Sequence, residues 1–404
     1  MPSVLFLYNA PENSLPVLMT KAIAQQNSDD IFKIIHKIIA IAHENNFADG
    51  NLWHNYLTYF LLSNENVFSL SCERREASEY SLKFLAEHDF DIFMRLFSFS
   101  DTVMELNYIK EFSEKIINTS PIIQLSEKLA NAFNSEEFFE YITDFYKKFG
   151  VGIFAFNKAF RINENSLIPV PDKNIGSVKF NDIVGYEIQK RELISNTEAF
   201  LAGRPANNVL LYGDGGTGKS TSVKALLNEY FEDGLRVVEI YKHQFRDILK
   251  LTEALRKRNY KFIIFIDDLS FEEHEIEYKY LKAVIEGGIE TKPDNVLIYA
   301  TSNRRHIIRE TWNDRSDMEH NGDIHRSDTV EEKLSLASRF GIAINYSAPT
   351  REEYHEIVLK LAEKSGLKFN RDDLLKAADT WEIRHGGKSG RAARQFIDYN
   401  LGRN

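Results

Sequence analysis

Residues 213–220 read Gly-Asp-Gly-Gly-Thr-Gly-Lys-Ser, which fits the pattern G-x-x-x-x-G-K-S/T of a phosphate-binding loop. In such a loop, glycines let the backbone curl until successive N–H groups point at phosphate oxygens. Lys219 is expected to reach the β- and γ-phosphates of a nucleoside triphosphate, and the Ser220 hydroxyl is expected to contact Mg²⁺. The pattern predicts a site for a nucleoside triphosphate and Mg²⁺ that is lined by Gly213, Asp214, Gly215, Gly216, Thr217, Gly218, Lys219, Ser220 and Thr221.

The segments around this loop agree with that interpretation. A short apolar run, 208–212, precedes the loop and is typical of a buried strand. The helix predicted from about 220 to 230 adds its positive N-terminal end to the same anion site.

A second apolar run, residues 261–266, ends in the carboxylates of Asp267 and Asp268. Its β-branched and aromatic residues are typical of a central parallel strand. Asp267 is predicted to hold Mg²⁺ through the water shell of the ion, so Ser220 and Asp267 are the expected metal-binding residues. Asp268 stands where a carboxylate can orient and polarise the attacking water. The alternative is that both acids, together with Ser270, cap the next helix.

Composition and length indicate an ordinary globular protein. The chain has 404 residues, enough for two or three domains, with 43% hydrophobic and 27% charged residues. No apolar run reaches the length of a membrane span, and no basic stretch precedes an apolar core at the N-terminus. The single cysteine, Cys72, excludes an internal disulfide and suits a reducing compartment. We therefore expect a cytoplasmic protein with no membrane partner.

The charge balance bears on the partners of the protein. A net charge of −10 at pH 7 argues against broad contact with a nucleic-acid backbone. Binding of nucleic acid by a local basic surface or by a pore loop is still compatible with this charge. Residues 1–170 hold 14 Lys and Arg against 22 Asp and Glu, so the front of the chain is acidic. A protein client is the expected partner of that part.

The periodicity of apolar residues divides the chain into three segments. Residues 1–165 show helical periodicity and predict a mostly helical N-terminal domain for partner or substrate recognition, without a catalytic constellation. Its aromatic stripes are either core or, in part, an exposed docking face. The helices predicted there are 31–44, 53–70, 75–87, 89–98, 122–133 and 136–148.

A linker with Pro169, Pro171 and Gly176 is predicted near 165–178. Residues 175–347 then alternate strands and helices, which indicates an α/β domain with a parallel sheet. Residues 348–404 predict a helical lid with helices at 351–364, 371–380 and 389–400. The strands expected in the α/β domain are 208–212, 235–240, 262–267, 295–301 and 341–346.

From about 175 to 404 the chain resembles the AAA+ ATPases. Residues 180–187 look like the segment that precedes the phosphate loop in this family, and the resemblance implies that Ile183, Val184 and Gly185 contact adenine. Alone, the same residues would suggest the start of a surface helix. Residues 297–303 resemble the sensor-1 strand, which implies that Asn303 holds the attacking water or reads the γ-phosphate. An asparagine at a strand end is otherwise a turn former.

Two arginines extend the resemblance. Residues 338–341, Ser-Arg-Phe-Gly, look like the arginine-finger box of Holliday-junction branch-migration helicases and replication initiators. In that case Arg339 acts on the ATP of a neighbouring subunit, which implies a homo-oligomer; the alternative is an ion-paired arginine at a helix end. Residues 388–396 resemble the sensor-2 helix, where Arg391 would reach the γ-phosphate, with Arg394 as the second candidate.

Two departures from the family pattern stand out. Most hydrolysing AAA+ proteins have Asp-Glu where this chain has Asp267 and Asp268, and a water-orienting group that is misplaced by ~1 Å can cost about 10²-fold in rate. Either hydrolysis is slow or Glu272 or Glu273 takes the role. Residues 305–331 form a long charged insertion that contains three histidines. It is interpreted as a solvated loop and candidate substrate contact, and as a metal site in the alternative; the histidines are His306, His320 and His325.

The amino-acid sequence around residues 211, 267–271 and 302–306 also resembles that of an uncharacterised bacterial family of predicted AAA+ ATP-binding proteins. We therefore expect an AAA+ protein that hydrolyses ATP to ADP and phosphate in an oligomer to remodel or load a macromolecular client. The alternative is an ATP-dependent switch or scaffold with slow turnover. A small-molecule kinase would account for the phosphate loop but not for the sensor and finger elements.

Overall fold

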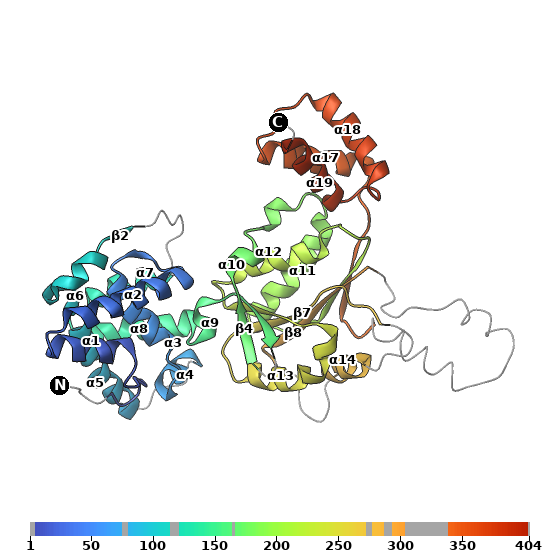
Figure 1. Ribbon diagram of the computed structural model, residues 1–404. Helices are drawn as coiled ribbons and strands as arrows, with labels where there is room; N and C mark the ends of the chain where they lie inside the picture. Colours follow the sequence, from blue (N-terminus) through green and yellow to red (C-terminus); the bar gives the residue numbers. More distant parts are fainter. Residues whose placement is uncertain are drawn as a thin grey trace. The chain divides into compact units, whose positions relative to one another are not determined.

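The structure is a computed structural model that describes residues 5–74, 80–113, 121–163, 166–271, 277–286, 293–303 and 338–402. The chain forms two compact units, Met1–Phe156 and Asn157–Asn404, which we call unit 1 and unit 2 (Figure 1). No helix in these described ranges is both long enough and apolar enough to cross a membrane.

Unit 1 is built from helices, several of which begin at an asparagine. The side chains of Asn27, Asn51, Asn66 and Asn134 each accept a hydrogen bond from a backbone N–H of the first helical turn. The elements are α1 (Leu15–Ala24), α2 (Ser28–Glu44), β1 (Asp49–Gly50), α3 (Leu52–Ser63), α4 (Val67–Glu73), α5 (Tyr80–Phe97), α6 (Phe99–Thr102), η1 (Met104–Ile109), β2 (Phe112–Ser113), α7 (Pro121–Ala130), α8 (Ser135–Phe149) and α9 (Ile153–Phe156).

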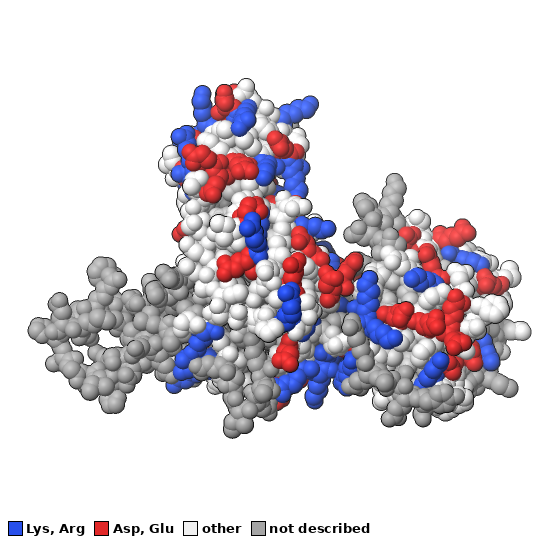
Figure 2. All heavy atoms as spheres, turned by 180° about the vertical axis from the view of Figure 1, so that it is seen from behind, with Lys and Arg blue, Asp and Glu red and all other residues white. Residues whose placement is uncertain are grey.

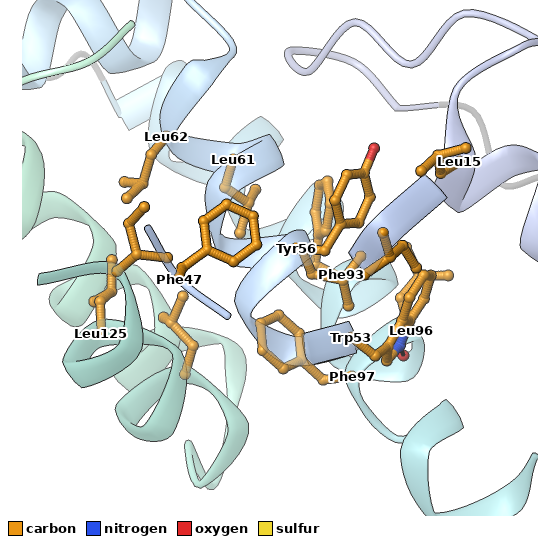
Figure 3. Packing of buried hydrophobic residues seen from close by; sticks show 14 of the residues in the cluster. Leu15, Phe47, Trp53, Tyr56, Leu61, Leu62, Phe93, Leu96, Phe97 and Leu125 are labelled. Atoms are coloured by element: carbon orange, nitrogen blue, oxygen red, sulfur yellow. Dashed lines mark hydrogen bonds between the residues drawn. The ribbon is translucent and has the colours of Figure 1, made fainter. Parts of the chain in front are cut away.

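The core of unit 1 surrounds α3. Trp53, Leu57 and Leu61 are fully buried there, and rings from α5 such as Phe93 pack beside them (Figure 3). The indole N–H of Trp53 donates to the carbonyl oxygen of Leu96 over 2.7 Å, so the largest core side chain leaves no polar atom without a partner. Most of the aromatic stripes that the sequence shows are therefore core.

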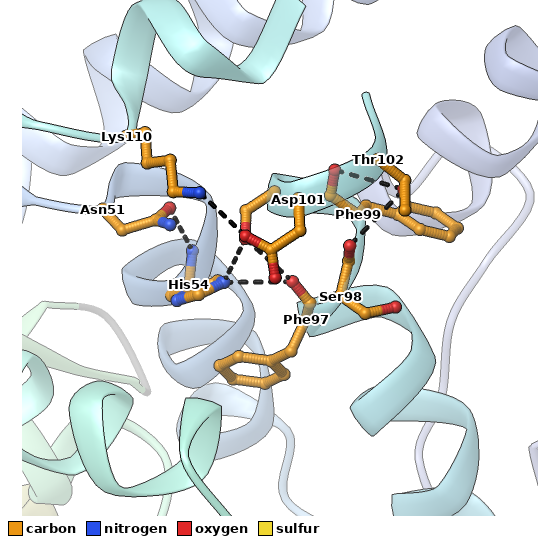
Figure 4. Close-up of polar contacts among 9 residues, drawn as sticks. Asn51, His54, Phe97, Ser98, Phe99, Asp101, Thr102 and Lys110 are labelled. Atoms are coloured by element: carbon orange, nitrogen blue, oxygen red, sulfur yellow. Dashed lines mark hydrogen bonds and ion pairs between the residues drawn. The ribbon is translucent and has the colours of Figure 1, made fainter. Parts of the chain in front are cut away.

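A polar cluster next to this core fastens α3 to the end of α5 and to α6 (Figure 4). The Nε2 atom of His54 lies 2.8 Å from the hydroxyl of Ser100 and 3.0 Å from the carbonyl oxygen of Phe97. Burial lowers the pKa of His54 below its ordinary value. At the edge of the cluster, Lys110 and Asp101 form an ion pair of 2.7 Å.

Three of the helices predicted in unit 1 differ from the structure. The helix expected over 53–70 ends at Ser63, because Asn66 and Ser69 exchange hydrogen bonds in a capping box that starts α4. The helices expected over 75–87 and 89–98 are one helix, α5, in the described part. Asp89 lies inside α5 with its side chain fully buried, and it accepts hydrogen bonds from the backbone N–H groups of residues 6–8.

Unit 2 contains a sheet whose strands in the described residues are arranged in the order β4-β3-β6-β7-β8-β5-β9. Only β3 and β4 pair antiparallel; the other neighbours are parallel. The strands are β3 (Ala159–Asn163), β4 (Ser166–Val170), β5 (Val209–Gly213), β6 (Leu235–Glu239), β7 (Lys261–Ile266), β8 (Val296–Ser302) and β9 (Ile342–Tyr346). The predicted α/β class with a parallel sheet is confirmed.

The hairpin of β3 and β4 was not predicted. Strand β3 pairs with β6 through residues 159–161, so it belongs to unit 2, although the predicted N-terminal domain extended to residue 165. The prolines at 169 and 171 suggested a linker, whereas Pro169 lies in β4, at the edge of the sheet, where a strand tolerates a missing N–H.

Helices connect the strands, and further helices form the lid. The connecting elements are α10 (Asp172–Ile175), η2 (Phe180–Asp182), α11 (Glu187–Leu201), α12 (Lys219–Tyr230), η3 (Lys242–Asp247), α13 (Ile248–Arg256) and α14 (Glu277–Glu286). The lid consists of α17 (Arg351–Lys364), α18 (Arg371–Arg384) and α19 (Gly390–Leu401), close to the predicted ranges, and these helices share a core of their own.

Strands β5, β7 and β8 bring the predicted site residues together. They are neighbours or near neighbours in a parallel array, so their carboxyl ends lie at the same edge of the sheet. The side chains of β7 and β8 are almost all buried, which fixes these ends firmly. That edge carries Gly213, Asp267 and Asn303.

Candidate nucleotide-binding site

The phosphate loop runs from Gly213, the last residue of β5, to Lys219, the first residue of α12. Gly213, Gly216 and Gly218 have φ values of 128°, 76° and 97°, which residues with a Cβ rarely adopt. At Gly213 a Cβ would also lie 2.2 Å from the carbonyl oxygen of Tyr346. At position 213, glycine is therefore required both by the backbone conformation and by the lack of space for a Cβ, as the sequence pattern predicts.

Lys219 lies across the loop. Its Nζ donates hydrogen bonds to the carbonyl oxygens of Gly213 and Asp214, at 2.9 and 2.6 Å, and to Oδ1 of Asn303 at 3.1 Å. Burial lowers the pKa of Lys219, while the nearby carboxylates of Asp214, Asp268 and Asp267 act in the opposite direction. The ammonium group is thus held at the edge of the sheet, close to the position predicted for phosphate.

The two residues predicted to bind Mg²⁺ touch each other. The hydroxyl of Ser220 donates to Oδ1 of Asp267 over 2.6 Å. Mg²⁺ prefers oxygen ligands in tight octahedral geometry and keeps several of its waters. A hydroxyl and a carboxylate side by side fit that requirement, and no group of three or more His, Cys, Asp or Glu in the described ranges offers an alternative metal centre.

Asp268 and Asn303 also meet. Nδ2 of Asn303 donates to Oδ1 of Asp268 over 2.9 Å, so Asn303 contacts both Lys219 and Asp268. Asp268 has a φ of 53°, in the left-handed region, which aspartate tolerates better than most residues.

The segment predicted to contact adenine lies beside the loop. The side chain of Ile183 would be 3.8 Å from a Cβ at Gly218, and Val184 packs against the core of the lid. Gly185 and Tyr186 follow with φ values of 76° and 61°. The ring of Tyr186 stacks on that of Tyr346, with centroids 5.1 Å apart.

The lid touches the phosphate loop through the start of α19. The backbone N–H of Arg391 donates to the carbonyl oxygen of Gly216 over 3.2 Å, and Ser389 caps the helix by accepting from the N–H of Ala392. The charge of Arg391 contributes to lowering the pKa of Lys219, although burial is the main cause.

Arg394 faces a different group. The pKa of Asp182 is lowered mainly by its ion pair with Lys364, and the charge of Arg394 adds a smaller effect of the same sign. Of the two arginines predicted for the sensor-2 role, Arg391 is therefore the one at the phosphate loop.

Two residues at the site have contacts that sequence reasoning did not predict. Oδ2 of Asp214 accepts the N–H of Ala348 over 2.7 Å, which ties the phosphate loop to the connection between β9 and the lid. The hydroxyl of Thr301 donates to Oδ1 of Asp267 over 2.6 Å. A threonine inside an apolar strand, a residue type that favours strands, gives little signal of such a contact.

Arg339 lies three residues before Ile342, the first residue of β9, and is half-buried, between the exposed Ser338 and the buried Phe340. The contacts within this one chain do not test its predicted action on a neighbouring subunit. Residues 304–337, with the charged insertion and its three histidines, lie outside the described residues, as do Glu272 and Glu273.

The sheet, the phosphate loop on β5, the acidic end of β7 and the helical lid define a P-loop protein of the AAA+ ATPase class, as the sequence predicts. Residues 153–404 match the family described as "Protein of unknown function (DUF815)", and the chain belongs to that family.

Other similarities are partial. The chain is 39% identical over 69 residues to the replication factor C large subunit of Staphylothermus marinus, which covers 17% of this chain and 16% of that protein. A structure of the RuvB Holliday junction branch migration motor of Thermotoga maritima aligns at 16% identity over 55% of this chain and 71% of its own, with a TM-score of 0.33. A variant of that RuvB aligns at 18% identity over 55% and 64%, with a TM-score of 0.36.

Proposed function

We propose that this AAA+ protein binds ATP with Mg²⁺ and hydrolyses it to ADP and phosphate in a homo-oligomer, in order to remodel or load a macromolecular client. One observation carries the proposal. The side chain of Asn303 contacts Lys219 at 3.1 Å and Asp268 at 2.9 Å, so the predicted phosphate-binding, water-orienting and sensing residues form one hydrogen-bonded group.

The residues of the chain have separate tasks in this reaction. Backbone N–H groups of residues 214–219 surround the β- and γ-phosphates, and Lys219 exchanges its carbonyl partners for phosphate oxygens. Ser220 and Asp267 would hold Mg²⁺, which when bound neutralises charge on the phosphates. The start of α19, with Arg391, reaches the same phosphates from the lid.

Asp268 is the group that orients the attacking water. Its carboxylate keeps one oxygen on the amide of Asn303, which leaves the other oxygen for the water. The amide therefore sets the direction of the carboxylate, and its second contact, to Lys219, makes that direction sensitive to the position of the lysine. A base held in this way typically contributes about 10²–10⁴ in rate.

Arg339 supplies positive charge to the γ-phosphate of a neighbouring subunit. The support is its sequence context, Ser-Arg-Phe-Gly, and its place three residues before the start of β9, the strand that pairs with β5. Such a finger is worth about 10³–10⁵ in rate. The protein then needs assembly for full activity.

Unit 1 is proposed to bind a protein client. Residues 1–156 hold 12 Lys and Arg against 21 Asp and Glu, and the face of unit 1 in Figure 2 carries acidic side chains with basic ones between them. Large apolar side chains are exposed on the same unit, among them Met104 at 81%, Tyr108 at 75% and Phe133 at 90%. Net negative charge with exposed aromatic groups favours a protein over a nucleic acid.

The test is the ATPase rate per subunit at increasing protein concentration, for the wild type and for Arg339→Ala. The rate should rise as the protein assembles and should fall by about 10³-fold in the variant. Arg351→Ala is a matched control, because that arginine is 65% exposed and pairs with Asp379 in the lid. A rate that is independent of concentration and unchanged in Arg339→Ala would refute the finger.

A second candidate function is an ATP-dependent switch with slow turnover. The specific observation is that Asp268 is one methylene shorter than the usual glutamate, and that its carboxylate already has Asn303 as a partner. This candidate predicts tight ATP binding with a single slow turnover. Rapid multiple turnover by the purified protein alone would exclude it.

A further inference from the structure

The hydroxyl of Thr301 joins the two acidic residues at the end of β7. Thr301 lies on the neighbouring strand β8 and is 2% exposed. Its Oγ1 donates to Oδ1 of Asp267 over 2.6 Å and accepts the backbone N–H of Asp268 over 2.9 Å. The carbonyl oxygen of Thr301 accepts the N–H of Leu269 over 2.7 Å, so three successive residues depend on it.

These contacts use the whole donor capacity of the Thr301 hydroxyl. A threonine hydroxyl has one proton to donate, and here that proton goes to a carboxylate rather than to the backbone. Oδ1 of Asp267 also accepts from Ser220, so two hydroxyl groups hold the same carboxylate oxygen. Both contacts are on Oδ1, so they restrict the rotation of the carboxylate and leave Oδ2 outside them.

The second contact acts on the backbone. Asp268 has a φ of 53°, which is costly for a residue other than glycine, and it is stable only where the surroundings hold it. The hydroxyl of Thr301 accepts the N–H of this residue and so stabilises the turn. This turn also places the carboxylate of Asp268 against Asn303.

Two buried threonines in helices of unit 2 behave differently. The hydroxyls of Thr197 and Thr252 donate to carbonyl oxygens of residues four positions earlier, Leu193 and Ile248, in their own helices. That is the usual way for a buried threonine to satisfy its proton in a helix. Thr301 instead contacts a charged side chain at the site.

We infer that Thr301 is a positioning residue for the Mg²⁺ site and for the water-orienting carboxylate. The inference rests on the proposed function, since it concerns the same ATP and Mg²⁺. Without the hydroxyl, Asp267 loses one of the two donors that fix it, and the N–H of Asp268 loses its acceptor. Partners of metal ligands typically contribute 10–100-fold to metal affinity or activity.

The experiment compares Thr301→Val, which removes the hydroxyl at nearly constant shape, with Thr301→Ser, which keeps it. Thr252→Val is the control for loss of a buried hydroxyl away from the site. Binding of Mn²⁺ in place of Mg²⁺, in the presence of a non-hydrolysable ATP analogue, is followed by electron paramagnetic resonance. The values of kcat and KM for ATP are measured in parallel.

Thr301→Val should weaken Mn²⁺ binding about 10-fold and lower kcat about 10- to 100-fold, with KM for ATP nearly unchanged. Thr301→Ser should stay within about threefold of the wild type, and Thr252→Val should change neither quantity. If the valine variant does not fold, Thr301→Ala takes its place, because it also removes the hydroxyl but adds no methyl group beside Asp267.

Three results would overturn the inference. One is wild-type Mn²⁺ affinity in the variants that lack the hydroxyl, and another is a loss in Thr301→Ser as large as in Thr301→Val. A loss of the same size in Thr252→Val is the third. If the wild type binds Mn²⁺ and nucleotide but does not hydrolyse ATP, the proposed ATPase activity is refuted. The Mn²⁺ affinities of the variants still decide whether Thr301 positions the metal site.

Discussion

The backbone N–H of Arg391 donates to the carbonyl oxygen of Gly216 over 3.2 Å, and the two residues are so close that a Cβ at Gly216 would lie 3.0 Å from that of Arg391. The lid therefore rests directly on the loop that is predicted to hold the phosphates. We therefore expect a shift of the phosphate loop at Gly216 to affect the start of α19, and a shift of α19 to affect the loop.

Arg391→Ala should weaken the binding of ATP more than that of ADP, because only ATP carries the γ-phosphate that the arginine is predicted to reach. The loss expected for one charge-assisted contact is about 10-fold. Fluorescence titration with both nucleotides measures it. Arg394→Ala, which alters a residue that acts on Asp182, should bind both nucleotides as the wild type does. Equal losses for ATP and ADP in Arg391→Ala would contradict the prediction.

Asp268→Asn should leave ATP binding within about threefold of the wild type and lower kcat by about 10²-fold or more. The amide keeps the shape and the contact with Asn303 but cannot polarise water as a carboxylate does. Steady-state turnover and nucleotide titration together separate the two effects. Asp233→Asn, a change at an exposed acid after α12, is the control. Full activity in Asp268→Asn would assign the water-orienting role to another acid.

Lys219→Ala should weaken ATP binding by at least about 100-fold, because several charge-assisted contacts disappear together. In the wild type, burial lowers the pKa of Lys219. The lysine therefore loses its proton at a lower pH than an exposed lysine, and ATP affinity should fall as the pH rises through that lowered pKa. Affinity measured across alkaline pH tests this, and an affinity that stays constant to the pH at which exposed lysines titrate would contradict it.

His54 predicts a pH dependence of stability in unit 1. Burial lowers its pKa in the folded state, so between that pKa and the ordinary value of 6.5 the unfolded chain binds more protons than the folded one. The free energy of unfolding should therefore decrease as the pH falls through 6.5 and continue to decrease until the folded-state pKa is passed.

His54→Gln should flatten this part of the stability curve, as measured by urea unfolding at a series of pH values. The control is His36→Gln, because His36 is exposed on α2. An unchanged slope in His54→Gln, or a slope lost equally in the control, would show that another group is responsible.

The sequence predicts unit 2 better than unit 1, for physical reasons. Buried parallel strands are continuous apolar runs, and the phosphate loop has a spacing that few other structures require, so both were located within a few residues. The meeting of Asp268 and Asn303 follows once their strands are parallel and close. The roles of these side chains in catalysis stay predictions.

The errors come from interactions between distant residues. The break after α3 depends on a capping box at Asn66 and Ser69, and helical periodicity continues across it. The continuity of α5 depends on the burial of Asp89 against the backbone of residues 6–8, which no local pattern reveals. The role of Thr301 is not predicted from the sequence, because its partner, Asp267, follows the neighbouring strand β7 and is distant in the chain.

The edge strand β4 has a consequence for self-association. An edge strand offers unpaired backbone groups to any passing chain and is a common starting point for aggregation. Here the edge strand is short, from Ser166 to Val170, and Pro169 lacks the N–H that an added strand would use. Pro169 therefore hinders the pairing of a further strand on this side of the sheet, which favours association through side-chain surfaces over extension of the sheet.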